Sequence, residues 1–182
     1  MSIGVFNPAV PENANDILLG EGIVKANSNI IGATQGGSKL EIEKVIRNIK
    51  HDGAYGPHKG LRRYDRCVAK LIINFLKITY TNLAYGLNVT VTDGSDADGT
   101  YKKIAFDPDF ASTDVLTTVT FEGYKHDGTA CIIRLENVLN LGNLGFEFKE
   151  KSEIVLPIEY TGFYTYAAPT VPPWKIRDYV PA

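Results

Sequence analysis

Alternating apolar and polar residues run through the second half of the chain and predict β-strands. In residues 130–138 the side chains of Cys131, Ile133 and Leu135 fall on one face, and charged side chains take the other. Residues 115–124 are rich in threonine and β-branched residues. Between the two segments lies a turn of the Asp-Gly kind, which favours hairpins. An antiparallel pair of strands is therefore expected here.

The most apolar run of the chain is residues 67–76, CVAKLIINFL. Ala69 and Leu71 begin one apolar face, and further apolar side chains lie on the opposite face. This pattern predicts a central strand that is covered on both sides. Residues 154–160 alternate as well, but Pro157 cannot donate a ladder hydrogen bond. That strand is therefore predicted to lie at an edge or at a bulge.

One short helix is expected after the apolar run. Thr79 has the side chain of an N-cap, and Asn88 follows the last apolar position. The apolar stripe has helical spacing and consists of Leu76, Tyr80, Leu83, Ala84 and Leu87. A helix of this length must pack on a sheet to be stable. Strands and helix together predict a mainly β fold, a two-sheet antiparallel β-sandwich or barrel with one flanking short α-helix.

Residues 38–50 carry two conflicting patterns. Ser38 with Glu41 matches a capping box, and the apolar residues that follow have helical spacing. As a strand, the segment requires a slip in its alternation near Lys44, of the kind that a β-bulge produces. Periodicity alone slightly favours the helix.

Residues 51–66 are predicted to form a long loop. The first ten of them hold three glycines and one proline, a composition that regular elements rarely contain. A loop of this length in a compact domain is disordered or lies against a partner. The second alternative is favoured by the contact-forming side chains among the glycines, which are Tyr55, His58, Lys59, Leu61, Arg62 and Arg63.

The two ends of the chain lack periodicity. Residues 1–15, rich in proline and asparagine, are expected to form an extended N-terminal arm. Residues 165–182 hold four prolines and one tryptophan and are expected to form an extended C-terminal tail. The length of 182 residues predicts a single domain. A β-protein with arms and exposed edges of this kind tends to assemble.

Composition narrows the functional classes. The apolar content of 44% and the charged content of 22% are ordinary for a globular protein. A net charge of −2 gives no electrostatic reason to expect a nucleic-acid-binding surface. No apolar run has membrane-spanning length, and the N-terminus lacks the pattern of a signal peptide, so synthesis in the cytoplasm is expected. Cys67 and Cys131 lie in apolar runs and are predicted to be reduced, buried thiols.

Candidate chemistry is sparse. The DGSDADG segment resembles a calcium loop, but Gly94 and Ala105 stand where its first and twelfth ligands belong, so it is predicted to be a turn. His51, His58 and His126 lie beside glycines, without a nucleophile elbow or metal-ligand spacing. The sequence therefore predicts no catalytic residue, no metal site and no cofactor, and the protein is not expected to be an enzyme.

Three segments, taken in order, resemble the major tail tube proteins of long-tailed non-contractile bacteriophages, the siphophage tail tube family. They are IIGATQGGSKLEIEKVIRNIKHDGAYGPHKGLRR, LKITYTNLAYGL and LPIEYTGFYTYAAPTVPPW. The resemblance implies one tail-tube domain over residues 1–182, a β-sandwich or barrel flanked by a helix. It also implies that residues 38–50 are extended, against their helical periodicity, and this expectation is adopted because pairing overrides local propensity.

The resemblance further implies a structural virion protein that polymerises as stacked hexameric rings. The rings form the tail tube, through which DNA passes on ejection without specific binding. The implied partners are further copies of the chain, the tape-measure protein, and the tail terminator and tail-tip proteins, with no membrane. The implied location is the virion tail, assembled in the cytoplasm of the bacterial host.

The resemblance assigns two sets of site residues. The first is an inter-subunit loop that includes Gly53, Tyr55, Gly56, Pro57, His58, Gly60, Arg62 and Arg63. The second is Glu41 with Glu43, which either face the lumen or belong to a solvated outer face.

The alternative class of protein is a non-catalytic β-sandwich binding or adhesion module for carbohydrate or a cell surface. Such a module would be monomeric and would expose an aromatic platform.

Overall fold

The structure is a computed structural model. It describes residues 18–179 except 51, 54, 57–58, 105–111, 144, 147–149 and 151–152. The expected N-terminal arm, residues 1–15, lies outside the described residues.

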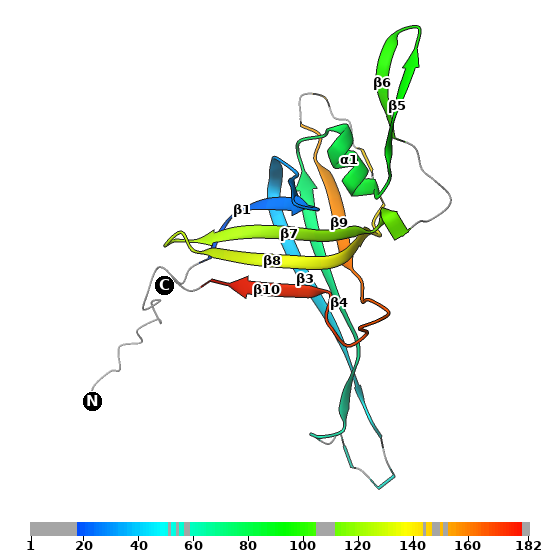
Figure 1. The fold of residues 1–182 in the computed structure, drawn as a ribbon. Coiled ribbons are helices and arrows are strands. Elements are labelled where there is room, and N and C mark those ends of the chain that lie inside the picture. The colour runs from blue at the N-terminus through cyan, green and yellow to red at the C-terminus, as the bar shows by residue number, and fades with distance from the viewer. Residues whose placement is uncertain are drawn as a thin grey trace, which may run out of the picture.

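The described chain is almost entirely β, with one short α-helix (Figure 1). The helix is α1 (Tyr80–Leu87), and a single 3₁₀ turn in the described chain spans Ser112–Asp114. The strands are β1 (Leu18–Ala26), β2 (Asn29–Ile30), β3 (Thr34–Asn48), β4 (Arg62–Phe75), β5 (Val91–Asp96), β6 (Gly99–Ile104), β7 (Leu116–Lys125), β8 (Ala130–Asn140), β9 (Leu156–Gly162) and β10 (Trp174–Asp178).

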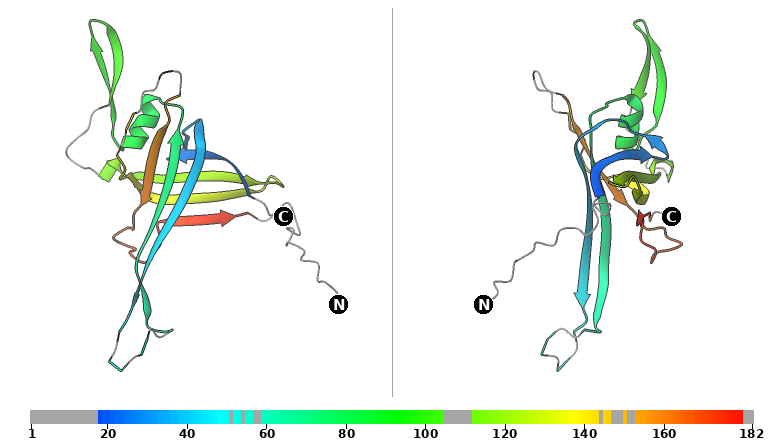
Figure 2. Two further views of the ribbon diagram at one scale, coloured as in Figure 1. Left: turned by 180° about the vertical axis from the view of Figure 1, so that it is seen from behind. Right: turned by 90° about the vertical axis from the view of Figure 1, so that its left-hand side faces the viewer.

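One hydrogen-bonded sheet of antiparallel strands folds into two layers. Its order is β2-β1-β7-β8-β9-β4-β3, and β10 pairs with the free part of β8. In Figures 1 and 2 the strands β1, β7, β8 and β10 cross those of β3, β4 and β9. The two layers join where Val138–Asn140 of β8 pair with Tyr160–Gly162 of β9. The predicted two-layer antiparallel architecture is confirmed, and within the described chain the sheet does not close into a barrel.

The hydrophobic core lies between the two layers. It is formed by inward side chains of both, because neighbouring residues of a strand point to opposite faces. On β4, Ala69 and Leu71 are buried as predicted, while Val68 on the opposite face is only half-buried. The buried apolar cluster comprises Val24, Ala26, Ile31, Leu116, Val119, Leu135 and Val138 with Leu71, Ile73, Phe75, Leu156, Ile158 and Tyr160.

Two further expectations for the strands are confirmed. Strand β4 is central, since it pairs with β3 on one side and with β9 on the other. Pro157 pairs with Asn74 of β4, whereas β9 meets β8 only from Tyr160 onward. The proline therefore lies on an edge, where no neighbouring strand requires a hydrogen bond from its position.

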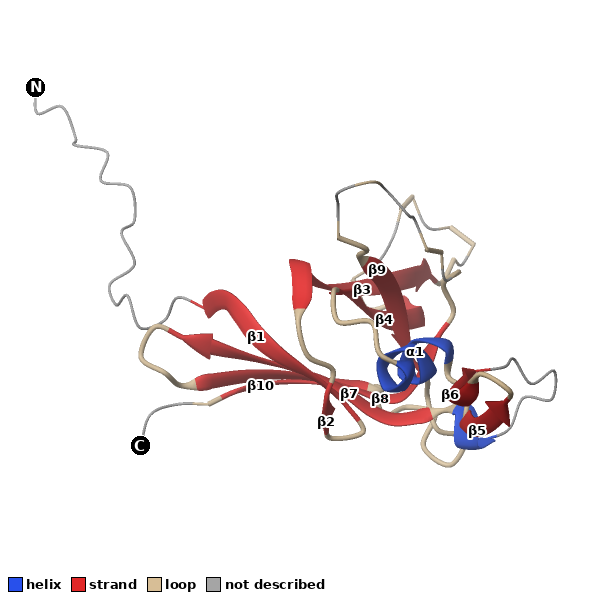
Figure 3. Ribbon diagram, turned by 90° about the horizontal axis from the view of Figure 1, so that it is seen from above, coloured by secondary structure: helices blue, strands red, loops and turns tan. Residues whose placement is uncertain are grey.

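The predicted helix is also present, with the predicted caps. The hydroxyl of Thr79 accepts a hydrogen bond from the Asn82 amide at 3.3 Å, and Asn88 takes the left-handed conformation at the C-cap. The helix covers one end of the sandwich (Figure 3). The predicted apolar stripe is wrong in part, because Tyr80 and Leu87 are exposed.

The buried face of α1 carries Asn82 and Gly86 instead. The side-chain amide of Asn82 donates to the carbonyl oxygens of Ile31 at 2.5 Å and Lys77 at 2.7 Å, which satisfies two buried acceptors. At Gly86 an added Cβ would collide with the terminal methyl of Ile158, so any other residue here would require that buried side chain to shift.

The helical periodicity of residues 38–50 is overruled by strand pairing. Strand β3 runs through this segment and pairs with β4 from Thr34 to Asn48. Its register shifts between Val45 and Ile46, next to the predicted slip near Lys44. The expectation that followed from periodicity is wrong, and the extended conformation implied by the resemblance is confirmed. Long-range pairing decides the conformation here, as it often does for β-branched segments.

The expected C-terminal tail, residues 165–182, is not free along its length. Residues Trp174–Asp178 form β10, which pairs with β8 from Leu135 to Cys131. Cys131 is buried and Cys67 is half-buried, and both are free thiols.

Replacing Asn82 by alanine is expected to lower the free energy of unfolding by about 1–3 kcal/mol, because two buried carbonyl oxygens lose their donor. Urea unfolding followed by circular dichroism measures the change. Thr81→Ala, an exposed position of the same helix, is the matched control and should shift stability by less than about 0.5 kcal/mol. Equal midpoints for both variants would show that Asn82 does not hold the helix in place.

Candidate functional site

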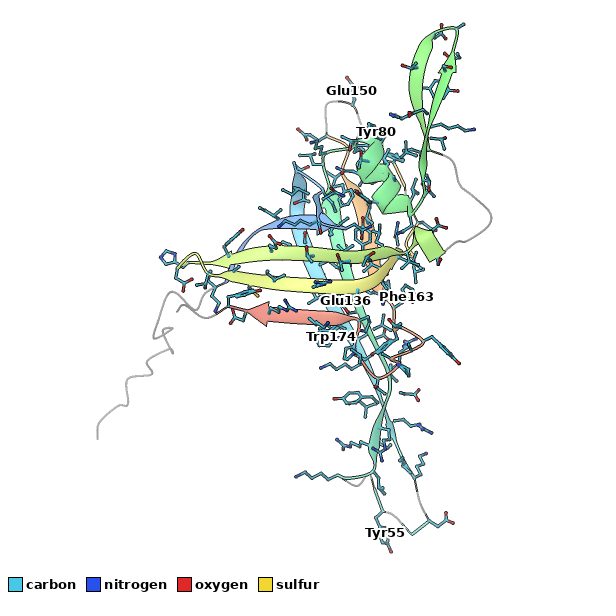
Figure 4. All side chains as sticks on the ribbon, viewed as in Figure 1. Tyr55, Tyr80, Glu136, Glu150, Phe163 and Trp174 are labelled. Carbon is cyan, nitrogen blue, oxygen red and sulfur yellow. The ribbon has the colours of Figure 1, made fainter. Side chains whose placement is uncertain are left out.

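The most distinctive feature of the molecule is a hairpin that extends far beyond the sandwich. It consists of residues 44–66, the outer parts of β3 and β4 with their connection, and is called the projection below. Its strands remain paired up to Asn48 and Arg62, and Ile49 donates to the carbonyl of Leu61 at 2.8 Å. Tyr55 lies at its far tip (Figure 4).

The projection exposes apolar side chains that a monomer would normally bury. Ile46 and Tyr64 are directly paired across the two strands and are 52% and 71% exposed. Val45, Ile49 and Tyr55 are exposed as well. Single apolar residues are normal on a surface, whereas several on one extended element are typical of an interaction surface.

The predicted inter-subunit loop is shorter than expected. Gly53, Tyr55, Gly56 and Gly60 lie in the connection between the strands, and Gly53 has a φ of +82°, which favours glycine. Pro57 and His58 lie outside the described residues.

Arg62 and Arg63, however, belong to β4 and not to the loop. They pair with Asn48 and Arg47 of β3, so the strand begins several residues earlier than the glycine content indicates. Arg62 and Arg63 are extended because they pair with β3, and the composition of their own segment does not reveal that pairing.

The projection is strongly basic. Residues 44–66 contain seven Lys and Arg against two Asp, a net charge of +5. Arg47 lies 3.8 Å from Asp65, and Arg66 forms an ion pair with Glu43. The remaining cations, Lys44, Lys50, Lys59, Arg62 and Arg63, form no ion pair within the described chain.

Glu41 and Glu43 lie on the face of β3 that points away from the core. They pair in register with Lys70 and Val68 of β4, whose inward neighbours Ala69 and Leu71 are buried. Leu40, next to Glu41, packs against the core as predicted.

This outward face is not a block of negative charge. Glu41 forms an ion pair with Lys39, and that hydrogen bond and charge lower the pKa of the Glu41 carboxyl. Lys70 forms an ion pair with Glu159 of β9 at 2.7 Å, which raises the pKa of the lysine. Glu43 forms an ion pair with Arg66. The carboxylates of Glu41, Glu43 and Glu159 therefore each have a cation beside them. The face is therefore close to neutral.

A groove of about 730 Å³ lies between the base of the projection and the segment that leads into β10. The hydroxyl of Tyr164 donates to the carbonyl of Cys67 at 3.2 Å and fixes this segment against β4. Sequence reasoning missed the groove, although the proline-rich tail and Trp174 gave a signal for it. Its lining residues include Tyr64, Cys67, Val68, Tyr164, Pro172 and Trp174.

The structure offers no arrangement for metal chemistry among the residues it describes. No three His, Cys, Asp or Glu side chains in the described ranges come together as a possible ion site. His126 is exposed in the β7–β8 turn, while His51 and His58 lie outside the described residues. The DGSDADG segment contains the turn of the β5–β6 hairpin, but the turn is shorter than predicted, because residues 93–96 belong to β5 and Gly99 begins β6. Asp96 accepts a hydrogen bond from the Asp98 amide at 3.0 Å.

Comparison with known proteins assigns neither a family nor a function to this chain. A scan against models of protein families finds no match for this chain, and a search of curated proteins finds no significantly similar sequence. Within the described part of the chain, no helix is long and apolar enough to cross a membrane.

The double variant Ile46→Ser, Tyr64→Ser is expected to leave the free energy of unfolding within about 0.5 kcal/mol of the native value, because both side chains are already exposed. Leu71→Ala on β4 is the contrasting variant and should cost about 2–5 kcal/mol, since Leu71 is fully buried. Thermal or urea unfolding of the three proteins makes the comparison. A large loss in the double variant would show that the exposed pair stabilises the monomer.

Proposed function

We propose that this protein is a non-catalytic structural subunit of a virion, the major tail tube protein of a long-tailed non-contractile bacteriophage. Its copies form hexameric rings, and the rings stack into a tube that conducts DNA during ejection. The observation that carries the proposal is the projection, a long paired hairpin whose apolar side chains are exposed and most of whose basic side chains form no ion pair within the described chain.

Two further features support self-association. Strand β3 has 15 residues and pairs only with β4 among the described strands, so its other edge is open to hydrogen bonding. A long open edge is a template for another chain unless a partner covers it. Repeated association of one kind of chain through different surfaces on its two sides gives rings or filaments.

In this proposal the residues of the projection contact neighbouring subunits. The side chains available for that contact include Tyr55 at the tip and the Ile46–Tyr64 pair behind it. The tape-measure protein would occupy the tube during assembly, and the tail terminator and tail-tip proteins would close its two ends. Assembly takes place in the host cytoplasm, and the finished protein resides in the virion tail.

Electron microscopy of the purified protein at increasing concentration tests the assignment directly. Rings or tubes of uniform diameter are expected. A protein that stays monomeric at a concentration of about 1 mM, where even an association with a Kd of about 1 μM is essentially complete, would exclude a tube-forming role.

Shortening the projection should abolish assembly and leave the fold intact. In the variant, residues 50–60 are replaced by Asn-Gly, a two-residue turn that suits the hydrogen-bonded pair of Ile49 and Leu61. Circular dichroism and sedimentation velocity give the two readouts. The length-matched variant Tyr55→Ser with Lys59→Ser separates loss of side chains from loss of length. Normal tubes from the shortened protein would remove the projection from the assembly contacts.

Glu41 and Glu43 are proposed to face the lumen, where a surface without net positive charge would not retain DNA. Each lysine or arginine that pairs with a phosphate releases counterions and strengthens DNA binding, so the double reversal Glu41→Lys, Glu43→Lys should slow or trap DNA during ejection. Tubes should still form, because both side chains are exposed.

Ejection rates from virions that carry this variant, at low and physiological salt, provide the measurement. The variant Glu122→Lys, on β7 in the other layer, has a carboxylate that is also paired, with Lys25 at 2.7 Å, and serves as the control. Ejection at the native rate at both salt concentrations would place Glu41 and Glu43 on a solvated outer face.

One observation favours the alternative class, a carbohydrate-binding or adhesion module. Tyr64, Tyr164 and Trp174 all line the groove at the base of the projection, and aromatic side chains around a concave site suit a sugar ring. A monomeric protein that binds an immobilised glycan, and loses this binding in Trp174→Ala, would support that function over the tube.

A further inference from the structure

A row of cationic side chains crosses the layer formed by β1, β7, β8 and β10, four strands that lie side by side (Figure 1). Thr120 of β7 pairs with Lys25 of β1 on one side and with Arg134 of β8 on the other. Arg134 in turn pairs with Lys175 of β10. The row faces away from the core, because Leu135 beside Arg134 is buried in it. Three of its four side chains are therefore cations on one outward surface.

A further cation, Arg177 of β10, reaches the same surface from the next row. Arg177 pairs with Ile132, two residues before Arg134, so the two arginines are diagonal neighbours on this face. Diagonal partners lie about 7–8 Å apart, within reach of long side chains. Both arginines line one hollow of about 300 Å³. The remaining lining residues are Lys25, Ser28, Thr118, Thr120, Glu122 and Ile132.

The lining of the hollow has a net charge of +2, from three cations and one carboxylate. Lys25 and Glu122 balance each other in an ion pair of 2.7 Å. The charges of Arg134 and Arg177 are left over. Like charges on neighbouring strands destabilise a sheet, and an anion between them removes that cost.

Neither arginine has a carboxylate of its own. Arg177 forms no ion pair within the described chain. Nε of Arg134 lies 3.4 Å from Glu136 but forms no hydrogen bond, and Glu136 also accepts at 2.9 Å from Lys175. A guanidinium group carries five N–H donors in a planar fork that matches the oxygens of phosphate or carboxylate. Two such forks border the hollow.

We propose that this hollow binds a dianionic phosphate group, which Arg134 and Arg177 hold from two sides. A phosphate monoester carries a charge of about −1.5 to −2 at neutral pH and has three acceptor oxygens. It balances the charge of the lining, whereas the two oxygens of a carboxylate are satisfied by a single arginine. The hydroxyl groups of Ser28, Thr118 and Thr120 border the hollow and supply further donors.

The size of the hollow fits a phosphate group with a small organic group attached. Ligand pockets have volumes of about 300–1,000 Å³, and this hollow lies at the lower end of that range. Ile132 offers the organic group an apolar contact. The site lies on a different layer from Glu41 and Glu43, and it does not depend on the proposed function.

Isothermal titration of the full chain with inorganic phosphate and with glycerol 3-phosphate tests the proposal. At about 0.15 M salt, saturable binding with a Kd of about 1 mM or lower is expected. Binding of the ester at least about threefold tighter would identify an organic phosphate as the ligand, and equal binding would identify the free ion. Acetate, a monoanion, should bind at least about tenfold more weakly. Chemical-shift changes of the Thr120 and Arg134 amides locate the ligand.

Variants of the two arginines give the second readout. Arg134→Gln and Arg177→Gln should each raise the Kd about tenfold, because charge-assisted hydrogen bonds are lost. Arg177→Lys keeps the charge without the planar fork and should give an intermediate Kd. Arg63→Gln makes the same change in net charge at an exposed position of β4 and should leave the Kd within about twofold. Urea unfolding without ligand checks the fold, and the exposed Arg177 tests the site independently of Arg134.

Four results would overturn the inference. The first is the absence of saturable binding of either phosphate up to a concentration of about 20 mM. The second is an equal loss in Arg63→Gln, which would make the binding a general effect of net charge. The third is acetate binding as tight as that of phosphate, which would assign the hollow to carboxylates of a protein partner. The fourth is binding of a DNA duplex alone, lost in the arginine variants. Failure to form tubes would remove the proposed function and leave this site untouched.

Discussion

The long pairing between β3 and β4 is the constraint on which the rest of the structure depends. Within the sandwich this pair contributes Leu71 and Ile73 to the core, and beyond it the same two strands continue without any core to cover. A two-stranded hairpin alone is at best marginally stable in water. The projection therefore takes its conformation from the anchored part of the pair, and the position of Tyr64 relative to the body is set by residues far from it.

The sequence predicted the architecture well where burial repeats every second residue. The alternation along β8 and the run at residues 67–76 led to the correct strands, and the caps at Thr79 and Asn88 led to the correct helix. The helical spacing of residues 38–50 misled because exposed Val45 and Ile46 supply apolar positions that no core requires. Because these side chains are exposed, their spacing follows neither the helical nor the strand period of a buried face.

The candidate surface was predicted in part. Glycine content identified the tip, and Tyr55 lies there, but composition could not show that Arg62 and Arg63 are held in a paired strand. The groove was not predicted from the sequence, because its lining residues come from segments about one hundred positions apart. The hydrogen bond between Tyr164 and Cys67 connects these two segments.

The register shift between Val45 and Ile46 has a consequence for how such a hairpin can change in length. Odd-numbered residues of β3 face even-numbered residues of β4 up to Val45, and even-numbered residues do so from Ile46 onward. Because side chains alternate, one residue added to a single strand beyond the shift would exchange the faces on which Ile46 and Arg47 lie. Within the paired strands, length can vary without this exchange only in steps of two residues in each strand, whereas the connection between Ile49 and Leu61 is free of this constraint.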